Sequence, residues 1–498
     1  MKGIKEQYLV AAILTVIVLV YGILALLSGG TYGGADDISH YQYARYAFDN
    51  PAFFFNWWAK PFFTAMAAPF AQIGPNGIRI FNVLIGAATA YFTYRTAREL
   101  KLKDPVLAIF LLLSSPLYTV LMLSGMTEIL FSFMLILSIF LFYRRKYGWA
   151  AVILSFIPFV RTEGMVILPL FVIAFIMERS WKSIPLLLFG TVFYSIAGSH
   201  YYHDLLWVIH SMPYTGNASD IYGSGSLFHY ARASKFIFGI PVTLLIPAGL
   251  LVWATVPWWD QGRTRKSWVL EMLVVYMPFF AYFAAHSYVW WKGAGNSVGL
   301  IRVIVAILPS AVLLALLGWS RLRALVPVKE LYKRIAAILF ALFLVIQPHR
   351  VYTIPVPLQS TQKYTKAASD WLMNSPYSQN KIFYFDPFVA HFLHLNPFDR
   401  ERCRRMLPDR EHPENNIRQG EIVIWDAHFG PNEGHVPLKN LMDNPGFRLI
   451  HIEQPEVPFN VLGGYNYEIY IFQRITEDDG NSNEELREQL IREKSSVE

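Results

Sequence analysis

The chain has 498 residues, of which 54% are hydrophobic, 16% aromatic and only 16% charged, and its mean hydropathy is +0.32. Soluble domains carry roughly 25% charged residues, so this composition excludes an ordinary soluble globular protein. The net charge of +7 would suit nucleic acid. In a membrane protein, however, such an excess records topology, and no nucleic-acid partner is expected. The single Cys403 excludes an intramolecular disulfide framework and a multi-cysteine metal site.

Apolar blocks recur along the first 350 residues, and many have the roughly 20 residues that cross a hydrocarbon core of about 30 Å. Lys and Arg concentrate in alternate connections, which the positive-inside rule places in the cytoplasm. The sequence thus predicts a polytopic α-helical membrane protein with about eleven spans, its N-terminus inside and its C-terminus outside. The predicted spans are 8–28, 78–98, 104–123, 126–143, 149–160, 164–178, 183–200, 236–256, 268–287, 298–318 and 334–348.

The stretch "GGADDISHYQYARYAF" follows the first span and presents two adjacent carboxylates, Asp36 and Asp37. We expect an interfacial helix here, with Asp37 or Ser39 at its N-cap, because its aromatic residues suit the headgroup region. One carboxylate could act as general base on an incoming hydroxyl or amine. The alternative is that both are solvated loop or capping residues.

Two further charged residues lie at predicted membrane boundaries. Lys60 opens a second interfacial segment, "KPFFTAMAAPFAQIG", and is either a topological anchor or a contact for an anionic lipid head. Glu128 lies at the outer end of a span. A carboxylate at the edge of the membrane is a functional candidate, and the alternative is a charge that complements the helix dipole.

Spans 149–160 and 164–178 are short for a membrane crossing, since a helix rises only about 1.5 Å per residue. They predict a helical hairpin that enters from the cytoplasm and turns at "RTEG". Arg161 and Glu163 would then lie at membrane depth, where they must pair or line a water-filled cavity. The alternative is an ordinary ion pair in a turn at the interface.

Two later outer connections are rich in histidine and glycine. "GSHYYHDLLW" contains His200, His203 and Asp204, a His-x-x-His-Asp pattern that could ligate a metal, although one short cluster without a further ligand is weak support. "HSYVWWKGAGNSVGLIRV" contains His286 and Arg302. Arg302 would lie about one turn inside the membrane and needs a partner, and a phosphate fits its guanidinium bidentately.

After residue 350 the composition becomes that of a soluble domain. "KIFYFDP", "EIVIWDAH", "FRLIHIE" and "YEIYIFQR" are typical of strands, and "TKAASDWLMN" and "VPLKNLMDN" favour helices between them. The sequence therefore predicts a membrane domain over 1–350, an extracytoplasmic α/β domain over 351–476 and a polar tail over 477–498. The tail is expected to be disordered.

The order of these features resembles the GT-C superfamily of integral-membrane glycosyltransferases. The matching features are the acidic pair in a long first outer loop, a second interfacial helix that begins "KP", "TEILFSFMLILSIFLFYRR", the "RTEG" hairpin, an Arg-bearing span and an outer α/β domain. Within it, the chain resembles the bacterial members akin to the lipid-linked-sugar transferases, protein mannosyltransferases and the aminoarabinose transferase that acts on lipid A.

The resemblance implies inverting transfer of a sugar, with mannose or another hexose expected, from a polyprenyl-phosphate donor. The acceptor would be a lipid, a glycan or a protein on the outer face of a bacterial inner membrane. Asp37 or Asp36 would deprotonate it, and Arg302, Lys60 and Arg161 would bind the donor phosphate. No cofactor is expected, and a divalent metal is the less favoured alternative. The residues assigned to acceptor or sugar binding are Glu128, Glu163, His203, Asp204 and His286.

Two other functional classes stay open at this stage. A transporter or lipid flippase would use a polar cavity for passage rather than chemistry, and it predicts broken helices in paired halves. A non-catalytic assembly subunit would use the α/β domain to bind partners.

Overall fold

The computed structural model describes residues 2–213, 223–259, 264–295, 297–476 and 482–495. The chain divides into two compact units. Unit 1 comprises Met1–Gly33 and Tyr43–Pro357, and unit 2 comprises Gly34–Gln42 together with Leu358–Glu498.

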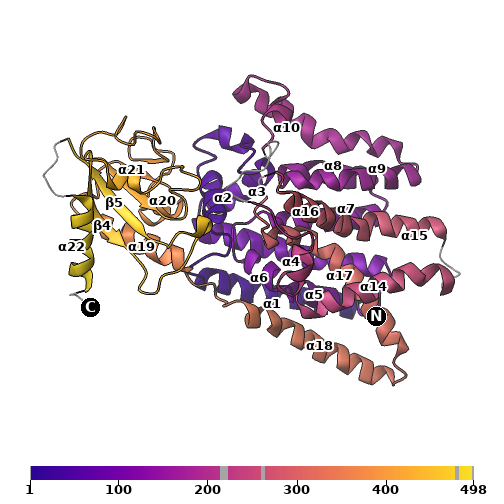
Figure 1. The fold of residues 1–498 in the computed structure, drawn as a ribbon. Helices are drawn as coiled ribbons and strands as arrows, with labels where there is room; N and C mark the ends of the chain where they lie inside the picture. Colours follow the sequence, from indigo (N-terminus) through magenta and orange to yellow (C-terminus); the bar gives the residue numbers. More distant parts are fainter. Residues whose placement is uncertain (1, 214–222, 260–263, 296, 477–481, 496–498) are drawn as a thin grey trace. The chain divides into compact units, whose positions relative to one another are not determined.

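Unit 1 is helical (Figure 1). Its longer helices are α1 (Lys2–Leu27), α3 (Pro61–Ala71), α4 (Pro75–Glu99), α7 (Glu128–Tyr143), α8 (Tyr147–Phe156), α9 (Leu168–Met177), α10 (Phe189–Tyr202), α14 (Ile240–Trp259), α16 (Met277–Lys292), α17 (Leu308–Leu325) and α18 (Glu330–Val351). Its shorter α-helices are α5 (Leu107–Leu113), α6 (Pro116–Met122), α11 (Trp207–His210), α12 (His229–Arg232), α13 (Ser234–Ile237) and α15 (Arg265–Glu271). Short segments of tighter or wider helix, three to seven residues long, include η1 (Pro51–Phe55), η2 (Ile157–Phe159), η3 (Thr162–Val166), η6 (Met272–Tyr276) and η7 (Ile301–Ile307).

Several helices are built to cross a membrane. Five segments within the described residues are long and apolar enough to span one, and each coincides with a predicted span. Apolar side chains of α1 and α18 remain exposed, as expected for faces that contact lipid. The chain is therefore an integral membrane protein, whereas the total of eleven spans stays a prediction. The five segments are Glu6–Leu27, Trp181–Tyr202, Arg265–Lys292, Ile301–Leu325 and Glu330–Val351.

One predicted span is wrong as a continuous helix. Residues 104–123 form α5 and α6, with a break at Ser114 and Ser115. Pro116 has no N–H for a helical hydrogen bond and clashes with the preceding turn, so a new helix starts there. The Ser115 hydroxyl caps α6 by accepting a hydrogen bond from the Tyr118 N–H at 3.1 Å.

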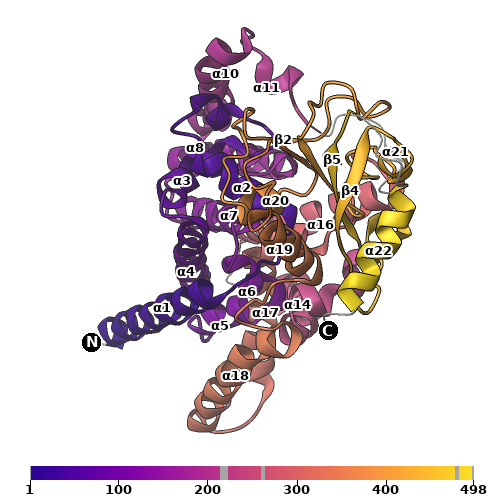
Figure 2. The same cartoon turned by 90° about the vertical axis from the view of Figure 1, so that its left-hand side faces the viewer.

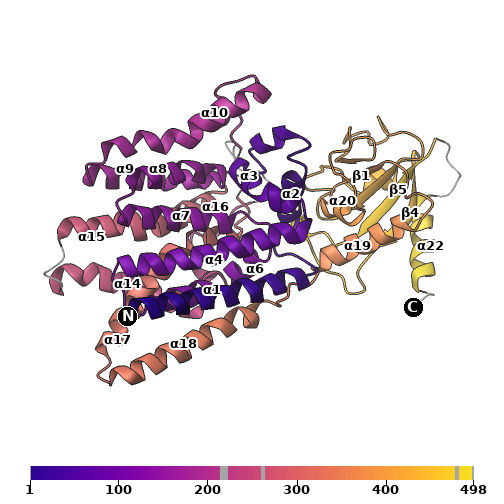
Figure 3. The ribbon, with the colours of Figure 1, turned by 180° about the vertical axis from the view of Figure 1, so that it is seen from behind.

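The predicted hairpin is confirmed. α8 and η2 run up to Val160, the chain turns at Arg161, and η3 and α9 return. Figure 3 shows α1, α4, α7 and α8 side by side in that order, so the hairpin packs on α7. Gly164 permits this close packing, because a Cβ there would lie 2.4 Å from Ile157 and 3.0 Å from Phe131.

Unit 2 is built around a five-stranded sheet of order β2-β1-β3-β5-β4. β1, β2 and β3 are parallel, whereas β5 pairs antiparallel with both β3 and β4. Four strands match the predicted ones. β2 escaped prediction because "CRR" is short and polar. The strands are β1 (Ile382–Tyr384), β2 (Cys403–Arg405), β3 (Ile422–Asp426), β4 (Phe447–Glu453) and β5 (Ile469–Arg474).

Helices cover both faces of this sheet, and each face has its own apolar core. The helices are α19 (Ser360–Met373), α20 (Phe388–Phe392), α21 (Lys439–Met442) and α22 (Asn483–Ser495). The expectation of a disordered tail is wrong for 483–495, while 477–481 and 496–498 lie outside the described residues. Buried Asn483 fixes the start of α22 by donating to the Phe447 carbonyl and accepting from the Leu449 N–H. α22 lies beside β4 (Figure 2).

Two buried aspartates lie at the carboxyl ends of neighbouring parallel strands: Asp386 follows β1 by two residues, and Asp426 is the last residue of β3. Asp386 accepts hydrogen bonds from the Phe388 N–H and the Thr365 hydroxyl, both at 2.9 Å. Asp426 accepts from the backbone N–H groups of His428 and Phe429. Burial raises the pKa of both carboxyls, that of Asp426 to about 8, and the negative charge of Asp386 adds to the rise at Asp426.

This arrangement predicts a stability that falls as pH rises. Between about pH 4 and 8 folded Asp426 holds a proton that the unfolded chain releases, so unfolding becomes easier by up to about 1.4 kcal/mol per pH unit. Asp426→Asn should flatten this slope, and exposed Asp443→Asn should not. Cys403 is the only cysteine and is buried, so it reacts with maleimide when the domain unfolds. The measurement is the urea concentration at which maleimide labels Cys403 in the full-length protein. An unchanged slope in Asp426→Asn would contradict the assignment.

Candidate active site

Unit 1 contains a buried cluster of charged side chains, centred on Glu128. This residue begins α7 and is fully buried. Its Oε1 atom lies 2.8 Å from Nη1 of Arg161 and 3.7 Å from Nε of Arg302. A buried carboxylate needs such partners, because an isolated charge in a low-dielectric interior is strongly destabilising.

Arg161 joins the two carboxylates of the cluster. It sits at the turn of the hairpin, and its Nη2 donates to Oε1 of Glu163 at 2.9 Å. Its Nη1 also donates to the Thr127 hydroxyl at 3.3 Å. The side chains of Arg161 and Arg302 keep 12% of their surface exposed and that of Glu163 keeps 35%, so the cluster is open on the Glu163 side.

Helix α16 adds two aromatic residues to the cluster. Nε2 of His286 lies 3.9 Å from Oε1 of Glu163. Tyr282, one helical turn earlier, packs against His286 with ring centroids 4.6 Å apart and interacts electrostatically with Arg161 and Glu163. Sequence reasoning missed Tyr282. Its spacing of four residues from His286 on a helix was the available signal.

Lys60 supplies a third cation. It is buried, it precedes α3 with a left-handed φ of 67°, and its ammonium interacts electrostatically with Glu163. Trp57 stacks on Phe159 at a centroid distance of 5.1 Å and thereby attaches the loop before Lys60 to the hairpin.

Charges of both signs make up the cluster. Lys60, Arg161 and Arg302 contribute three cations, and Glu128 and Glu163 contribute two carboxylates. Several cations held close together in a largely buried setting favour binding of an anion. A planar guanidinium suits a phosphate in particular, because it can donate two parallel hydrogen bonds.

The loop that leads to Glu128 is held by buried Asn82 of α4. Its side-chain amide donates to the carbonyl oxygens of Ser124 at 2.6 Å and Met126 at 2.9 Å. These hydrogen bonds fix the chain in the four residues before Glu128. Arg302 in turn donates to the Gly33 carbonyl at 3.4 Å, at the end of the loop after α1.

The acidic pair lies in unit 2. Asp36 and Asp37 occupy the first turn of α2 (Ala35–Arg45), so the expectation that Asp37 or Ser39 is the N-cap is wrong. The helix begins three residues earlier than an N-cap at Asp37 predicts, because Gly34 takes a φ of +60° and turns the chain into it. Two carboxylates in a first turn also complement the helix dipole. Asp37 is buried.

His203 and Asp204 lie on a different element from the cluster. His203 ends α10 in a left-handed conformation. Asp204 accepts hydrogen bonds from the Leu206 N–H and binds Nδ1 of His210 at 2.7 Å. Among the described residues, no group of three His, Cys, Asp or Glu side chains is arranged to hold a metal ion.

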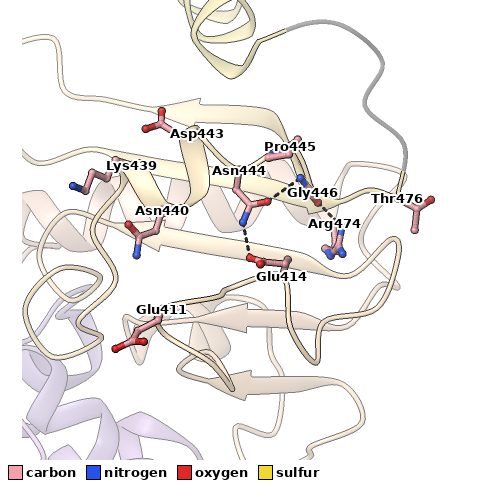
Figure 4. A pocket seen from close by; sticks show the side chains of 10 residues that line it. All are labelled: Glu411, Glu414, Lys439, Asn440, Asp443, Asn444, Pro445, Gly446, Arg474 and Thr476. Atoms are coloured by element: carbon pink, nitrogen blue, oxygen red, sulfur yellow. Dashed lines mark hydrogen bonds between the residues drawn. The ribbon is translucent and has the colours of Figure 1, made fainter.

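Unit 2 also contains an open polar hollow of about 780 Å³ beside α21 (Figure 4). Its Asn444 donates to Glu414 and accepts from the Gly446 N–H, and Arg474 donates to the Gly446 carbonyl. The lining side chains thus bind largely to one another. None of the residues that the sequence singled out lies there.

Comparison with known proteins identifies the fold. No family model matches the chain, and no curated protein matches it in sequence. The structure of ArnT from Cupriavidus metallidurans in the apo state matches with a TM-score of 0.58 and 11% identity, covering 95% of this chain and 98% of that one. The chain has the fold of ArnT.

Two further solved structures are similar. ArnT from Cupriavidus metallidurans bound to undecaprenyl phosphate matches with a TM-score of 0.55 and 12% identity over 94% of this chain and 98% of that one. Arabinofuranosyltransferase AftD from Mycobacteria matches with a TM-score of 0.48 and 13% identity, over 94% of this chain and 42% of that one. ArnT is a GT-C glycosyltransferase, so the resemblance found in the sequence is confirmed at the level of the fold.

The buried cluster predicts unequal effects of two arginine substitutions. Arg161→Gln leaves Glu128 with a more distant partner and should destabilise the protein by about 3 kcal/mol. Arg144→Gln removes an arginine that pairs with Glu99 in an exposed setting, and it should cost less than about 1 kcal/mol. Thermal unfolding of the purified proteins in detergent measures both. Equal shifts in Tm would contradict a buried network around Glu128.

Proposed function

We propose that this protein is an inverting glycosyltransferase that uses a polyprenyl-phosphate sugar as donor. The observation that carries the proposal is the group of three buried or largely buried cations, Lys60, Arg161 and Arg302, in unit 1. A polyprenyl-phosphate sugar is a phosphodiester with one negative charge, and guanidinium groups suit its phosphate oxygens. The fold supports the same donor class, since ArnT was solved with undecaprenyl phosphate.

The cationic cluster suits the chemistry of such a donor. When the bond between the anomeric carbon and the phosphate oxygen breaks, the electron pair stays on the phosphate, which becomes a monoester with up to two negative charges. Cations held in place before the reaction stabilise this developing charge without reorganisation. Arg302, Arg161 and Lys60 are proposed to do so, with Glu128 holding both guanidiniums in position.

The acceptor must lose a proton as it attacks. In our proposal Asp37 or Asp36 takes the proton from the acceptor hydroxyl or amine, whose oxygen or nitrogen forms the new bond on the face opposite the leaving phosphate. The anomeric configuration is thereby inverted. Glu163, His286, His203 and Asp204 are proposed to contact the acceptor or the sugar.

The proposal extends to the sugar of the donor and to the acceptor. We propose mannose or another hexose as the sugar, and a lipid, glycan or protein on the extracytoplasmic face of a bacterial inner membrane as the acceptor. The protein's own cations meet the leaving phosphate, so the transfer is proposed to proceed without a resident metal. Activity that survives a chelator would agree with this.

The direct test is a donor panel. The purified protein in lipid nanodiscs is incubated with polyprenyl-phosphate and polyprenyl-pyrophosphate sugars together with membrane extracts as a source of acceptor. We expect one monophosphate donor to release free polyprenyl phosphate. A protein that moves the intact lipid across liposomes and cleaves no donor would be a flippase instead.

Once the donor is identified, the variants Asp37→Asn and Asp36→Asn test which aspartate is the general base. The substitution at the true base should lower kcat by about 10²–10⁴-fold and leave the donor KM within about twofold. Exposed Asp49→Asn is the matched control and should retain full turnover. If the protein with both Asp36 and Asp37 replaced still transferred sugar, the assignment would be wrong.

The phosphate site is tested by binding. Arg302→Gln removes one of three cations while Glu128 keeps Arg161 as partner, so we expect the Kd for undecaprenyl phosphate to rise at least about tenfold, or about 1.4 kcal/mol. Exposed Arg321→Gln serves as control. Titration of labelled undecaprenyl phosphate into nanodiscs gives both constants, and equal constants would remove Arg302 from the donor site.

A further inference from the structure

The segment that carries the two aspartates packs on the α/β domain. Residues 34–42, which we call the acidic segment, belong to unit 2 although more than three hundred residues separate them from its sheet. The Gln42 side-chain amide donates to the Pro387 carbonyl at 3.2 Å in a buried hydrogen bond. Tyr41 meets His391 edge-on, with ring centroids 6.4 Å apart.

These anchors lie just beyond the carboxyl end of β1. Pro387 follows that strand by three residues, and His391 is in α20, the helix that comes next. In open α/β sheets, ligands bind outside the carboxyl ends of the parallel strands. Here the group bound beyond one such end is a segment of the same chain.

An ion pair of the domain also faces the acidic segment. Arg405, the last residue of β2, donates to the Phe385 carbonyl and pairs with Oε2 of Glu433 at 3.1 Å. Burial raises the pKa of Glu433, Arg405 opposes this, and the Asp36 carboxylate adds to the rise. Asp36 and Glu433 are thus near enough to interact, and Arg405 offsets part of their mutual repulsion.

The acidic segment needs such support. α2 has only 11 residues, and isolated helices shorter than about 12–15 residues are marginal in water. A general base must hold its geometry to within about 0.5 Å to be effective. Helix propensity alone does not supply that precision.

We propose that the α/β domain positions the catalytic base: the anchors Pro387 and His391 and the Arg405–Glu433 pair hold the acidic segment and fix the direction and the charge environment of Asp36 and Asp37. Pro387, His391, Arg405 and Glu433 are positioning residues. This inference rests on the proposed function for its catalytic part, whereas the contact itself does not depend on it.

The contact is tested by a reversible cross-link in the full-length protein. Tyr41→Cys/His391→Cys is treated in membranes with a short, reducible bis-thiol reagent, and linked peptides are identified by mass spectrometry. Cys403 is the only native cysteine and is buried, so background labelling is low. We expect a link in the double variant and in neither single one. Failure of the link to form would overturn the contact whatever the protein's activity.

The same double variant tests the role. Loss of the two rings should lower donor turnover, and the link should raise it again because it restores the contact. Reduction of the link should return turnover to the lower value. A link that forms and lowers turnover, with recovery on reduction, would overturn positioning by this contact.

A kinetic comparison separates positioning from mere stability. Arg405→Gln should lower kcat about tenfold while the donor KM and the urea midpoint of Cys403 labelling stay unchanged, and Arg405→Lys should recover part of kcat. Exposed Arg400→Gln is the control. An unchanged kcat in Arg405→Gln would overturn the role of the ion pair. If the wild-type protein cleaves no polyprenyl donor, the proposed function fails while the cross-link result stands.

Discussion

The pairing of buried Glu128 with Arg161 and Arg302 is the constraint on which the membrane unit depends. A carboxylate buried at the start of α7 is tolerable only with cationic partners. The three charges therefore tie together the start of α7, the turn of the α8–α9 hairpin and η7, the seven-residue segment before α17. Two guanidiniums share the Glu128 carboxylate, and Arg161 also pairs with Glu163. In our proposal the side chains that stabilise the fold also bind the donor phosphate.

Sequence reasoning reached the parts of this structure that local patterns encode. Hydropathy and charge placed the five long apolar segments and the hairpin turn at Arg161, and residue alternation placed four strands. It failed where a local detail overrode the pattern. Pro116 breaks an apolar run that reads as one span, Gly34 starts α2 three residues early, and the second strand is too short to show alternation.

The individual residues of the candidate site were recognised in the sequence, but the contacts that bring them together were not. Glu128, Arg161 and Arg302 each stood out as an ionisable group near a membrane span. No spacing rule indicates that Arg161 and Arg302 share the Glu128 carboxylate, because Arg161 lies 33 residues after Glu128 and Arg302 follows much later. Tyr282 escaped notice because an aromatic residue in an apolar helix is typical of lipid contact or core. Packing of the acidic segment on the α/β domain is a long-range contact of the same kind.

The distance along the chain between Gln42 and Pro387, 345 residues, has a consequence for biogenesis. The acidic segment is synthesised before helices α3 to α18, whereas the β1 strand and the α20 helix that hold it are synthesised after them. The segment therefore lacks its tertiary support until the α/β domain has been synthesised and has folded. A chain interrupted between α2 and β1 would contain both aspartates without the surface that holds them, which makes synthesis of the α/β domain a condition for an ordered acidic segment.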